Sequence, residues 1–250
     1  MSGEIKQTIK VLSSQTDMNT KVGLIESCSF FQDNMCEFFG NLKCDGLHLV
    51  PLRHAFWAIT KNKIRFNGDA CWLDTIELTT RLTKLSGVRL NLESKIEKSG
   101  VSVAECLQEL CAMDSDTRKL RLISSIPEFP SDIEVNEKSS DLEFEKLDFE
   151  LTENDFVKET VVDANNIDFF GHTNNIEYVR FMYGTIPPRV IKSFRLKEFE
   201  IHYLKESRES DKLRIYKREE NSDYLFEIRK DDVTLCKAIL KFENWLTKIL

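Results

Sequence analysis

Residues 168–178 bring an acid, an imidazole and two amides together just before an amphipathic segment that predicts a helix. These side chains are Asp168, His172, Asn174 and Asn175. Asn174 has the residue type of an N-cap, and Glu177 is placed three residues later as its capping-box partner. A helix start carries unpaired N–H groups and a partial positive charge, which can polarise a carbonyl or stabilise a developing oxyanion. The pattern predicts a carbonyl site, with an ordinary capped helix after a polar loop as the alternative.

The composition limits the classes of protein to consider. A chain of 250 residues with 41% hydrophobic residues can build one large domain or two smaller ones, which argues against a wholly disordered chain. Its net charge of −7 does not indicate a nucleic-acid binder or a protein of the membrane surface. The seven cysteines form no Cys-x-x-Cys pair, and no secretory signal or membrane-spanning run is visible. We therefore expect a cytoplasmic protein with reduced thiols, no metal and no membrane insertion.

The two halves of the chain share one order of elements, a helix followed by several strands. In the first half, apolar residues recur every three or four positions over 22–42, which predicts a helix. Alternating β-branched and aromatic residues predict strands over 55–66, 74–85, 87–97 and 101–113. Residues 128–143 are acidic, contain serine and proline, and lack periodicity, so they are predicted to form a linker.

The second half repeats this plan. Its predicted elements are a strand over 156–163, a helix over 174–185 that stops before Pro187-Pro188, and strands over 194–204, 211–218, 223–230 and 233–243. A helix with several antiparallel strands close in sequence is an α+β arrangement in which the sheet curls around the helix. We expect an N-terminal domain over 1–127 and a C-terminal domain over 144–250 that carries the polar motif.

The motif around His172 resembles that of the acyl-acyl-carrier-protein thioesterases of bacterial type. That family carries Asp-x-Asn-x-His-Val-Asn-Asn-x-x-Tyr, and this chain has Asp-Phe-Phe-Gly-His-Thr-Asn-Asn-Ile-Glu-Tyr over 168–178. A family segment Tyr-Arg-Arg-Glu-Cys is similar to Tyr-Leu-Lys-Glu-Ser over 203–207, and Ala-Phe-Trp-Ala-Ile-Thr over 55–60 resembles the strand entering the first domain. The resemblance implies an α+β tandem (double) hotdog fold, each half a long helix wrapped by a curved antiparallel sheet. It also implies hydrolysis of acyl thioesters, releasing fatty acid for lipid metabolism without a cofactor.

The resemblance also implies roles for individual residues. Asp168 would orient and polarise its neighbours, His172 would hydrogen-bond in the catalytic network, and Glu206 would activate water as general base. The alternatives are a loop imidazole that caps a backbone group and a solvated charged loop around Glu206. Candidates for positioning the substrate are Asn174, Asn175, Ser207 and Phe170.

Two of these positions depart from the family pattern. Phe170 stands where the family has Asn, which removes a polar group for which Asn165, Asn166 or Asn174 could compensate. Ser207 stands where the family has Cys. A nucleophilic Ser207 with His172 as its base ranks below activation of water by Glu206.

The partner implied by the resemblance is an acyl carrier protein with an acyl chain linked through 4'-phosphopantetheine. Acyl carrier proteins are acidic, so docking requires a positive patch. The candidates for it are Arg189, Lys192, Arg195 and Lys197, with Lys205 and Arg208 flanking Glu206. Acyl-coenzyme A hydrolysis and acyl-thioester binding without turnover are the alternatives. The preferred chain length and the choice between monomer and homodimer stay open.

Overall fold

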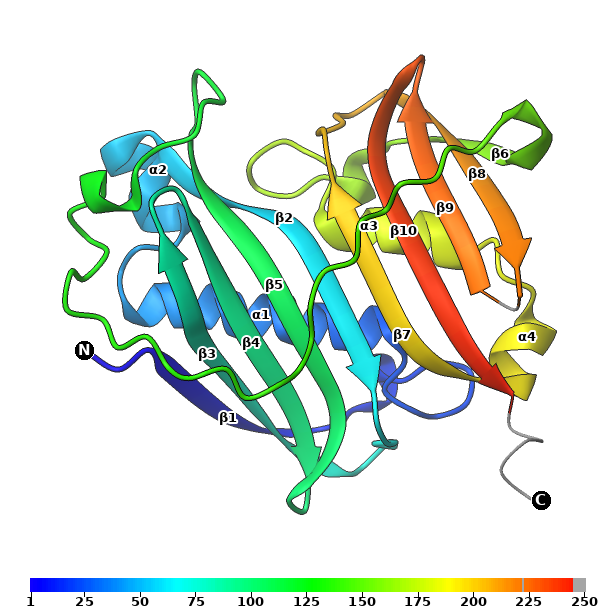
Figure 1. Ribbon diagram of the computed structural model, residues 1–250, viewed down its shortest axis with the longest axis horizontal. Coiled ribbons are helices and arrows are strands. Elements are labelled where there is room, and N and C mark those ends of the chain that lie inside the picture. Colours follow the sequence, from blue (N-terminus) through cyan, green and yellow to red (C-terminus); the bar gives the residue numbers. More distant parts are fainter. Residues whose placement is uncertain (222, 245–250) are drawn as a thin grey trace. The chain divides into compact units, whose positions relative to one another are not determined.

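The computed structural model describes residues 1–221 and 223–244 and divides the chain into two units, Met1–Glu143 and Phe144–Leu250 (Figure 1). Each unit has its own helix and its own antiparallel sheet. Residues 128–143, expected to be a linker, lie within the first unit and contain no helix or strand.

The first unit packs helices against one face of a five-stranded sheet. Its elements are β1 (Glu4–Lys10), α1 (Leu24–Asn41), α2 (Gly46–Arg53), β2 (Ala55–Phe66), β3 (Thr75–Ser86), β4 (Arg89–Lys98) and β5 (Val101–Asp114), with 3-10 turns at Ser13–Gln15 and Ile123–Ser125. The strand order is β1-β3-β4-β5-β2, and neighbouring strands are antiparallel. Gly87 and Gly100 take positive φ in the tight turns between β3, β4 and β5, a conformation that glycine adopts without strain.

Helix α1 forms the centre of the first core. Its spacing of apolar residues puts Phe31, Phe38 and Phe39 on one buried face, and the ring of Trp57 on β2 stacks on Phe39 at 4.7 Å. Burial of each such side chain contributes about 1.5–3 kcal/mol. Asn34 on the same helix donates from Nδ2 to Thr80 Oγ1 on β3 at 2.6 Å, which fixes the helix to the sheet.

The second unit repeats the arrangement with shorter helices. Its elements are β6 (Phe156–Val161), α3 (Asn175–Tyr183), α4 (Pro188–Ser193), β7 (Phe194–Tyr203), β8 (Lys212–Glu220), β9 (Asp223–Lys230) and β10 (Val233–Asn244), with 3-10 turns at Glu153–Asp155 and Ala164–Asn166. The strand order is β7-β10-β9-β8-β6, again antiparallel. Helix α3 packs against β8 and β9 through its buried face, formed by Tyr178, Val179 and Met182.

The segment 144–155, here called the strap, crosses the face of the second sheet that carries the odd-numbered side chains of β9 (Figure 1). The buried Glu200 accepts the backbone N–H of Glu145 at 2.9 Å, and the buried Glu227 accepts that of Leu151 at 3.2 Å. Leu151 also packs with Tyr216 and Leu225 in a small apolar cluster. A segment without regular structure is therefore fixed by buried carboxylates on the strands beneath it.

A buried carboxylate also fixes the end of the first unit to its sheet. Glu93 on β4 is buried, and its Oε2 accepts the backbone N–H groups of Ser139 and Ser140 at 2.8 and 3.1 Å. Asp141 forms an ion pair with Arg65 on β2. These bonds tie the predicted linker to its sheet.

Several elements differ from the sequence prediction. The expected long helix of the second half is only nine residues, because it ends at Tyr183, and Pro188 begins a separate short helix instead of only ending the first. Proline suits the first turn of a helix, where its missing N–H is not needed. Strand β1 and helix α2 were not predicted, and α2 even contains Pro51.

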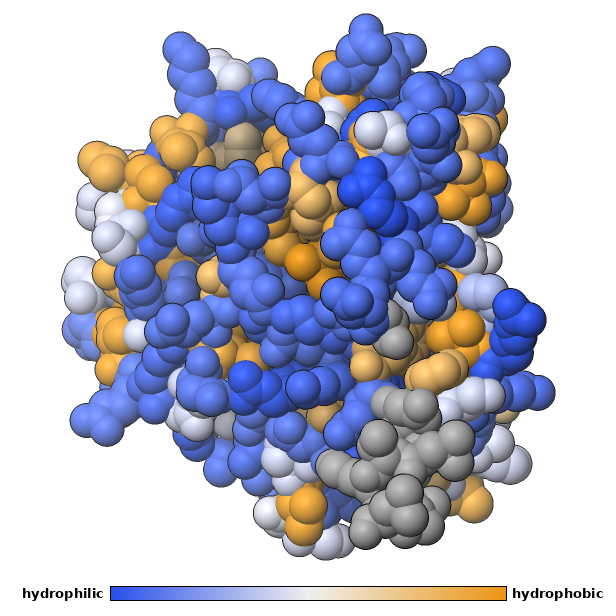
Figure 2. All heavy atoms as spheres, turned by 45° about the vertical axis from the view of Figure 1, so that its right-hand side comes forward, coloured by the Kyte–Doolittle hydropathy of each residue, from blue (hydrophilic) through white to orange (hydrophobic). Residues whose placement is uncertain are grey.

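The surface shown in Figure 2 is mostly hydrophilic, with hydrophobic residues in several separate patches. Within the described ranges, no helix combines the length and the apolar content that a membrane span requires.

Candidate active site

The loop 168–174 is folded around the side chain of Asp168. Its Oδ1 accepts the backbone N–H groups of Phe170 at 2.9 Å and His172 at 3.3 Å, while its own N–H donates to the His172 carbonyl at 2.8 Å. Gly171 has φ +77°, a conformation that other residues rarely adopt. Asp168 thus sets the conformation of the loop that carries His172.

Burial is the main reason that the pKa of Asp168 is raised above its ordinary value. The Glu206 carboxylate raises it slightly further, whereas the two backbone N–H groups and His172 lower it. The three residues therefore share one electrostatic neighbourhood, as the motif predicts.

His172 and Glu206 meet across two loops that are distant in sequence. His172 Nε2 lies 3.4 Å from Glu206 Oε2. The His172 side chain is 9% exposed, whereas that of Glu206 is 42% exposed. A buried imidazole therefore borders a carboxylate that water can reach, and such a carboxylate is chemically able to take a proton from water.

Ser207 lies next to Glu206 but faces a different set of partners. Its side chain is 1% exposed, and its Oγ is 2.7 Å from both Thr173 Oγ1 and Tyr178 Oη. The Tyr178 hydroxyl also accepts the Ser207 N–H at 2.9 Å, and Thr173 N–H donates to the Ser207 carbonyl at 2.9 Å. These bonds join the loop after β7 to the start of α3.

This network makes the alternative of a Ser207–His172 nucleophile–base pair wrong for this structure. The Ser207 hydroxyl is bound by two other hydroxyls and is almost inaccessible to solvent. Neither of these hydroxyls is a base at neutral pH, and burial raises the pKa of Tyr178 to about 12. Ser207 holds the loop that positions Glu206.

Asn174 caps α3, as predicted, because its Oδ1 accepts the N–H of Ile176 at 2.9 Å. The prediction that Glu177 is the capping-box partner of Asn174 is wrong. Its carboxylate accepts a hydrogen bond from Asn166 Nδ2 at 2.9 Å, and the N–H of Asn174 donates to the Asn166 carbonyl at 2.8 Å. The preceding 3-10 turn thus closes the N-terminus of this helix.

These bonds limit the amides that could replace the missing family asparagine. Asn166 Oδ1 accepts the Asp163 N–H at 3.0 Å while its Nδ2 is bound to Glu177, and Asn174 Oδ1 is bound to the helix start. The expectation that Asn166 or Asn174 compensates is therefore not supported by their geometry. Asn165 is exposed at the 3-10 turn.

Asn175 and Phe170 occupy the rest of the motif. The carbonyl of Asn175 accepts the Tyr203 hydroxyl at 3.1 Å, which links the first turn of α3 to the end of β7. The Phe170 ring is half-buried and lies 4.1 Å from the ring of Phe169, which is 69% exposed. An apolar pair therefore stands where the family pattern has a polar side chain.

The four cations proposed for docking do not gather at this site. Arg189 and Lys192 lie on α4, and Arg195 and Lys197 lie at the start of β7. Glu206 follows the opposite end of that strand, three residues after Tyr203, and His172 lies 3.4 Å from it. Lys205 and Arg208, both exposed, instead flank Glu206 in sequence.

Sequence analysis missed the roles of Thr173 and Tyr178 in holding Ser207. A signal was present, since Tyr178 lies four residues after the N-cap and so shares a helix face with it. Its partner is 29 residues away, however, and no local pattern identifies it.

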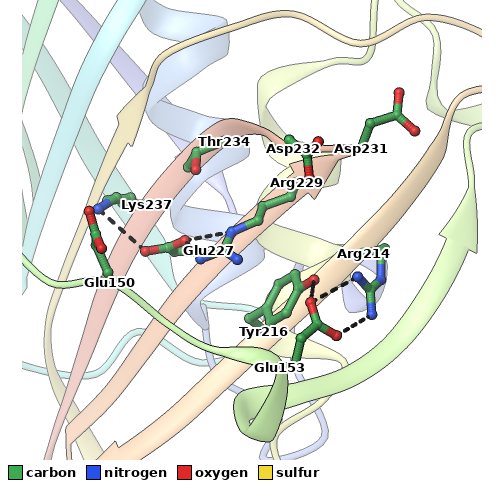
Figure 3. A pocket seen from close by; sticks show the side chains of 10 residues that line it. All are labelled: Glu150, Glu153, Arg214, Tyr216, Glu227, Arg229, Asp231, Asp232, Thr234 and Lys237. Atoms are coloured by element: carbon green, nitrogen blue, oxygen red, sulfur yellow. Dashed lines mark hydrogen bonds and ion pairs between the residues drawn. The ribbon is translucent and has the colours of Figure 1, made fainter.

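A polar cleft lies elsewhere in the second unit, lined by Tyr216, Thr234 and charged residues of the strap and strands β8 to β10 (Figure 3). Arginine and lysine side chains of this cleft form ion pairs with its glutamates. Arg214 binds Glu153 at 2.7 Å, and Arg229 and Lys237 flank Glu227, Lys237 at 3.3 Å. The cleft shares no residue with the His172–Glu206 pair. In the described part of the chain, no three His, Cys, Asp or Glu side chains come together as metal ligands.

Comparison with solved structures defines the fold class. An acyl-ACP thioesterase from Bacteroides thetaiotaomicron superposes with a TM-score of 0.85 at 16% identity, covering 96% of this chain and 98% of that one. The 12:0-ACP thioesterase from Umbellularia californica gives 0.84 at 16% identity over 96% and 97%. The chain is thus an α+β protein of the double hotdog class, as the sequence predicts.

Comparison of sequences finds a family match over the C-terminal part of the chain. Residues 149–244 match the model of the acyl-ACP thioesterase C-terminal domain. A chloroplastic acyl-[acyl-carrier-protein] hydrolase of Cuphea viscosissima is 24% identical over 254 residues, and a chloroplastic palmitoyl-acyl carrier protein thioesterase of Cuphea hookeriana is 27% identical over 178. These alignments cover 96% and 66% of this chain but only 59% and 42% of those relatives. Over residues 149–244 the chain thus matches the acyl-ACP thioesterase family, and it spans about half the length of these curated relatives.

Proposed function

We propose that this protein hydrolyses acyl thioesters of acyl carrier protein and releases free fatty acid. The observation that carries the proposal is the His172–Glu206 pair, in which a half-exposed carboxylate borders a buried imidazole at 3.4 Å. The family model and the named activities of the relatives support acyl carrier protein as the carrier.

In the proposed reaction, Glu206 removes a proton from a water molecule while the oxygen of that water attacks the thioester carbonyl carbon. His172 orients the Glu206 carboxylate, and Asp168 maintains the conformation of the loop that carries His172. The tetrahedral intermediate then collapses, the C–S bond breaks, and the proton held by Glu206 passes to the departing thiolate. The products are a carboxylic acid and the thiol of the carrier.

The partial positive charge at the start of α3 favours the oxyanion that forms on the carbonyl oxygen. The Ile176 N–H donates to the Asn174 side chain, so this N–H is used by the helix cap. Phe170 supplies no hydrogen bond from its side chain. We therefore propose a working site with one polar group fewer than the family pattern.

The docking surface proposed for the carrier is the rim around Glu206. Lys205 and Arg208 are exposed there, and Leu204 and Phe169 add exposed apolar area, at 50% and 69%. An acidic carrier that presents an apolar acyl chain matches a basic and apolar rim. We propose this rim in place of the cations on α4 and β7, and we keep a cytoplasmic location as a prediction.

The test is thiol release from acyl-acyl-carrier-protein and acyl-coenzyme A thioesters of matched chain lengths, using wild type and the double variant Lys205→Ala/Arg208→Ala. We expect turnover of the carrier-protein substrate, with KM about tenfold higher in the double variant and kcat unchanged. The matched control is Arg189→Ala/Lys192→Ala, for which we expect no change. Turnover of coenzyme A thioesters alone would reassign the carrier. Tight binding without turnover of either would make the protein a binding module.

A further inference from the structure

Helix α2 of the first unit exposes most of its apolar side chains. Of residues 46–53, Leu49 alone is buried, whereas Leu47 and Leu52 are 73% and 59% exposed. A surface helix ordinarily directs its apolar residues toward the core, because their contact with water is unfavourable. A helix that exposes them indicates a surface that a partner or another apolar phase covers.

A second segment with exposed leucines adjoins this helix. Residues 115–122 follow β5, and the side chain of Arg121 donates to the carbonyl of Arg53 in the last turn of α2. Leu120 and Leu122 of this segment are both more than half exposed. The two pairs of leucines therefore lie at the end of the unit that carries α2 (Figure 1). We call Leu47, Leu52, Leu120 and Leu122 the leucine patch.

Net positive charge surrounds the leucine patch, although the chain as a whole is acidic. Over 43–54 and 114–122 there are five lysine or arginine residues and three aspartates, whereas the whole chain has a net charge of −7. Lys43 and Lys119 are exposed. Three of the nearby acids contact histidine or arginine side chains, namely Asp45 with His48, Asp116 with His54 and Glu128 with Arg53.

Exposed leucines with positive charge around them match the surface of an anionic bilayer. Leucine side chains enter the layer between headgroups and acyl chains, while lysine and arginine side chains are attracted to the phosphate groups. A second copy of the chain matches less well, because a two-fold interface would place the same basic side chains opposite each other. An acidic carrier protein has its own proposed docking surface, around Glu206 in the second unit.

We propose that the leucine patch and the basic side chains around it bind the protein to the surface of membranes that contain anionic phospholipids. This inference goes beyond the proposed function and does not depend on it, because no residue of the patch belongs to the His172–Glu206 site. The net charge of the whole chain predicts no membrane affinity, but it averages over this local excess of the opposite sign. Because salt screens exposed charges, binding should weaken as the ionic strength rises.

Co-sedimentation with vesicles tests the proposal, using phosphatidylcholine alone and equal parts of phosphatidylcholine and phosphatidylglycerol. We expect wild type to bind the mixed vesicles at least about tenfold more strongly, with a loss of this preference at high salt. Leu47→Ser/Leu52→Ser should bind the mixed vesicles about tenfold more weakly than wild type, because two apolar side chains no longer leave water. Lys43→Glu/Lys119→Glu should lose the preference for the mixed vesicles.

The matched control is Leu12→Ser/Leu73→Ser. It changes two leucines of the first unit that are also more than half exposed but lie outside the leucine patch. Its binding should equal that of wild type. Thermal unfolding of each variant establishes that a loss of binding is not a loss of folding.

Several results would overturn the inference. Wild type that does not sediment with the mixed vesicles, or that binds both kinds of vesicle equally, rejects an anionic membrane as the partner. An equal loss of binding in the control variant would remove the special role of the patch. Without vesicle binding, a dimer that Leu47→Ser/Leu52→Ser dissociates in analytical ultracentrifugation would assign the patch to a second copy, and a raised KM for the carrier-protein substrate in that variant would assign it to the carrier.

Discussion

Replacement of Ser207 by alanine separates a structural hydroxyl from a catalytic one. The substitution removes two hydroxyl contacts of 2.7 Å, to Thr173 and to Tyr178. Each neutral hydrogen bond contributes about 1 kcal/mol net. Thr173 Oγ1 keeps the Ser207 carbonyl at 3.2 Å, and the Tyr178 hydroxyl keeps the Ser207 N–H at 2.9 Å, so neither group is left unpaired. We therefore expect a loss of about 2 kcal/mol in the free energy of unfolding.

Turnover should change little in the same variant. Because Glu206 activates water in the proposed mechanism, Ser207→Ala is expected to lose less than tenfold in kcat. Tyr178→Phe leaves the buried Ser207 N–H without its acceptor, so it should cost at least as much stability. Ser193→Ala, at an exposed serine of α4, is the control and should match wild type in both respects.

The assays are urea unfolding followed by fluorescence and thiol release at saturating substrate. A Ser207→Ala protein that unfolds at the wild-type urea concentration but loses about 10³-fold or more in kcat would refute the reasoning. That result would make the hydroxyl the nucleophile, since loss of a nucleophile removes most of the rate.

Three further predictions concern the loop and the strap. Phe170→Asn restores the polar group of the family pattern and should raise kcat by about tenfold or more, and an unchanged or lower kcat would show that the ring does not limit the site. Glu227→Ala leaves the Leu151 N–H and two cations without their buried acceptor, so urea unfolding should show a loss of about 3 kcal/mol, whereas a loss below 1 kcal/mol would contradict the anchoring role. Hydrogen bonds from Arg218 hold the pKa of Asp155 below its ordinary value of 3.8, so its stabilisation is complete above that pH and is lost as the pH falls through the lower folded value. Thermal unfolding of Asp155→Asn should therefore differ from wild type at pH 6 and converge with it in acid, and a difference that is independent of pH would contradict this assignment.

Much of the fold follows from patterns that are local in the sequence. The predicted strands lie within two residues of β2 to β10 at every end, because alternating residues mark the two faces of each strand and turn residues mark its ends. Strand β1 alternates as well, but polar residues hide its pattern, and Pro51 argues against the helix that contains it. The strap escaped prediction because its partners are buried glutamates on distant strands, and nothing local distinguishes a glutamate that binds backbone from one in solvent.

In the site, too, the residues of the local motif were predicted, whereas contacts between distant loops were not. The motif over 168–178 led to Asp168 and His172, and the segment 203–207 led to Glu206. The structure places His172 Nε2 3.4 Å from Glu206 Oε2, and the Asp168 carboxylate accepts the His172 N–H. The partners of Ser207 and the position of the docking cations depend on how loops from two ends of the second sheet fold. Arg195 and Lys205 are ten residues apart in sequence but lie at opposite ends of β7, and only the extended strand reveals that separation.

The most direct test of the account is a double-variant cycle on the His172–Glu206 pair, with acyl-acyl-carrier-protein hydrolysis as the readout. We predict that His172→Ala and Glu206→Gln each lower kcat by at least about 10²-fold, and that the double variant is scarcely slower than the worse single one, because both act on the same water. Losses that multiply in the double variant, or a Glu206→Gln protein with wild-type kcat, would contradict the central claim that this pair activates water.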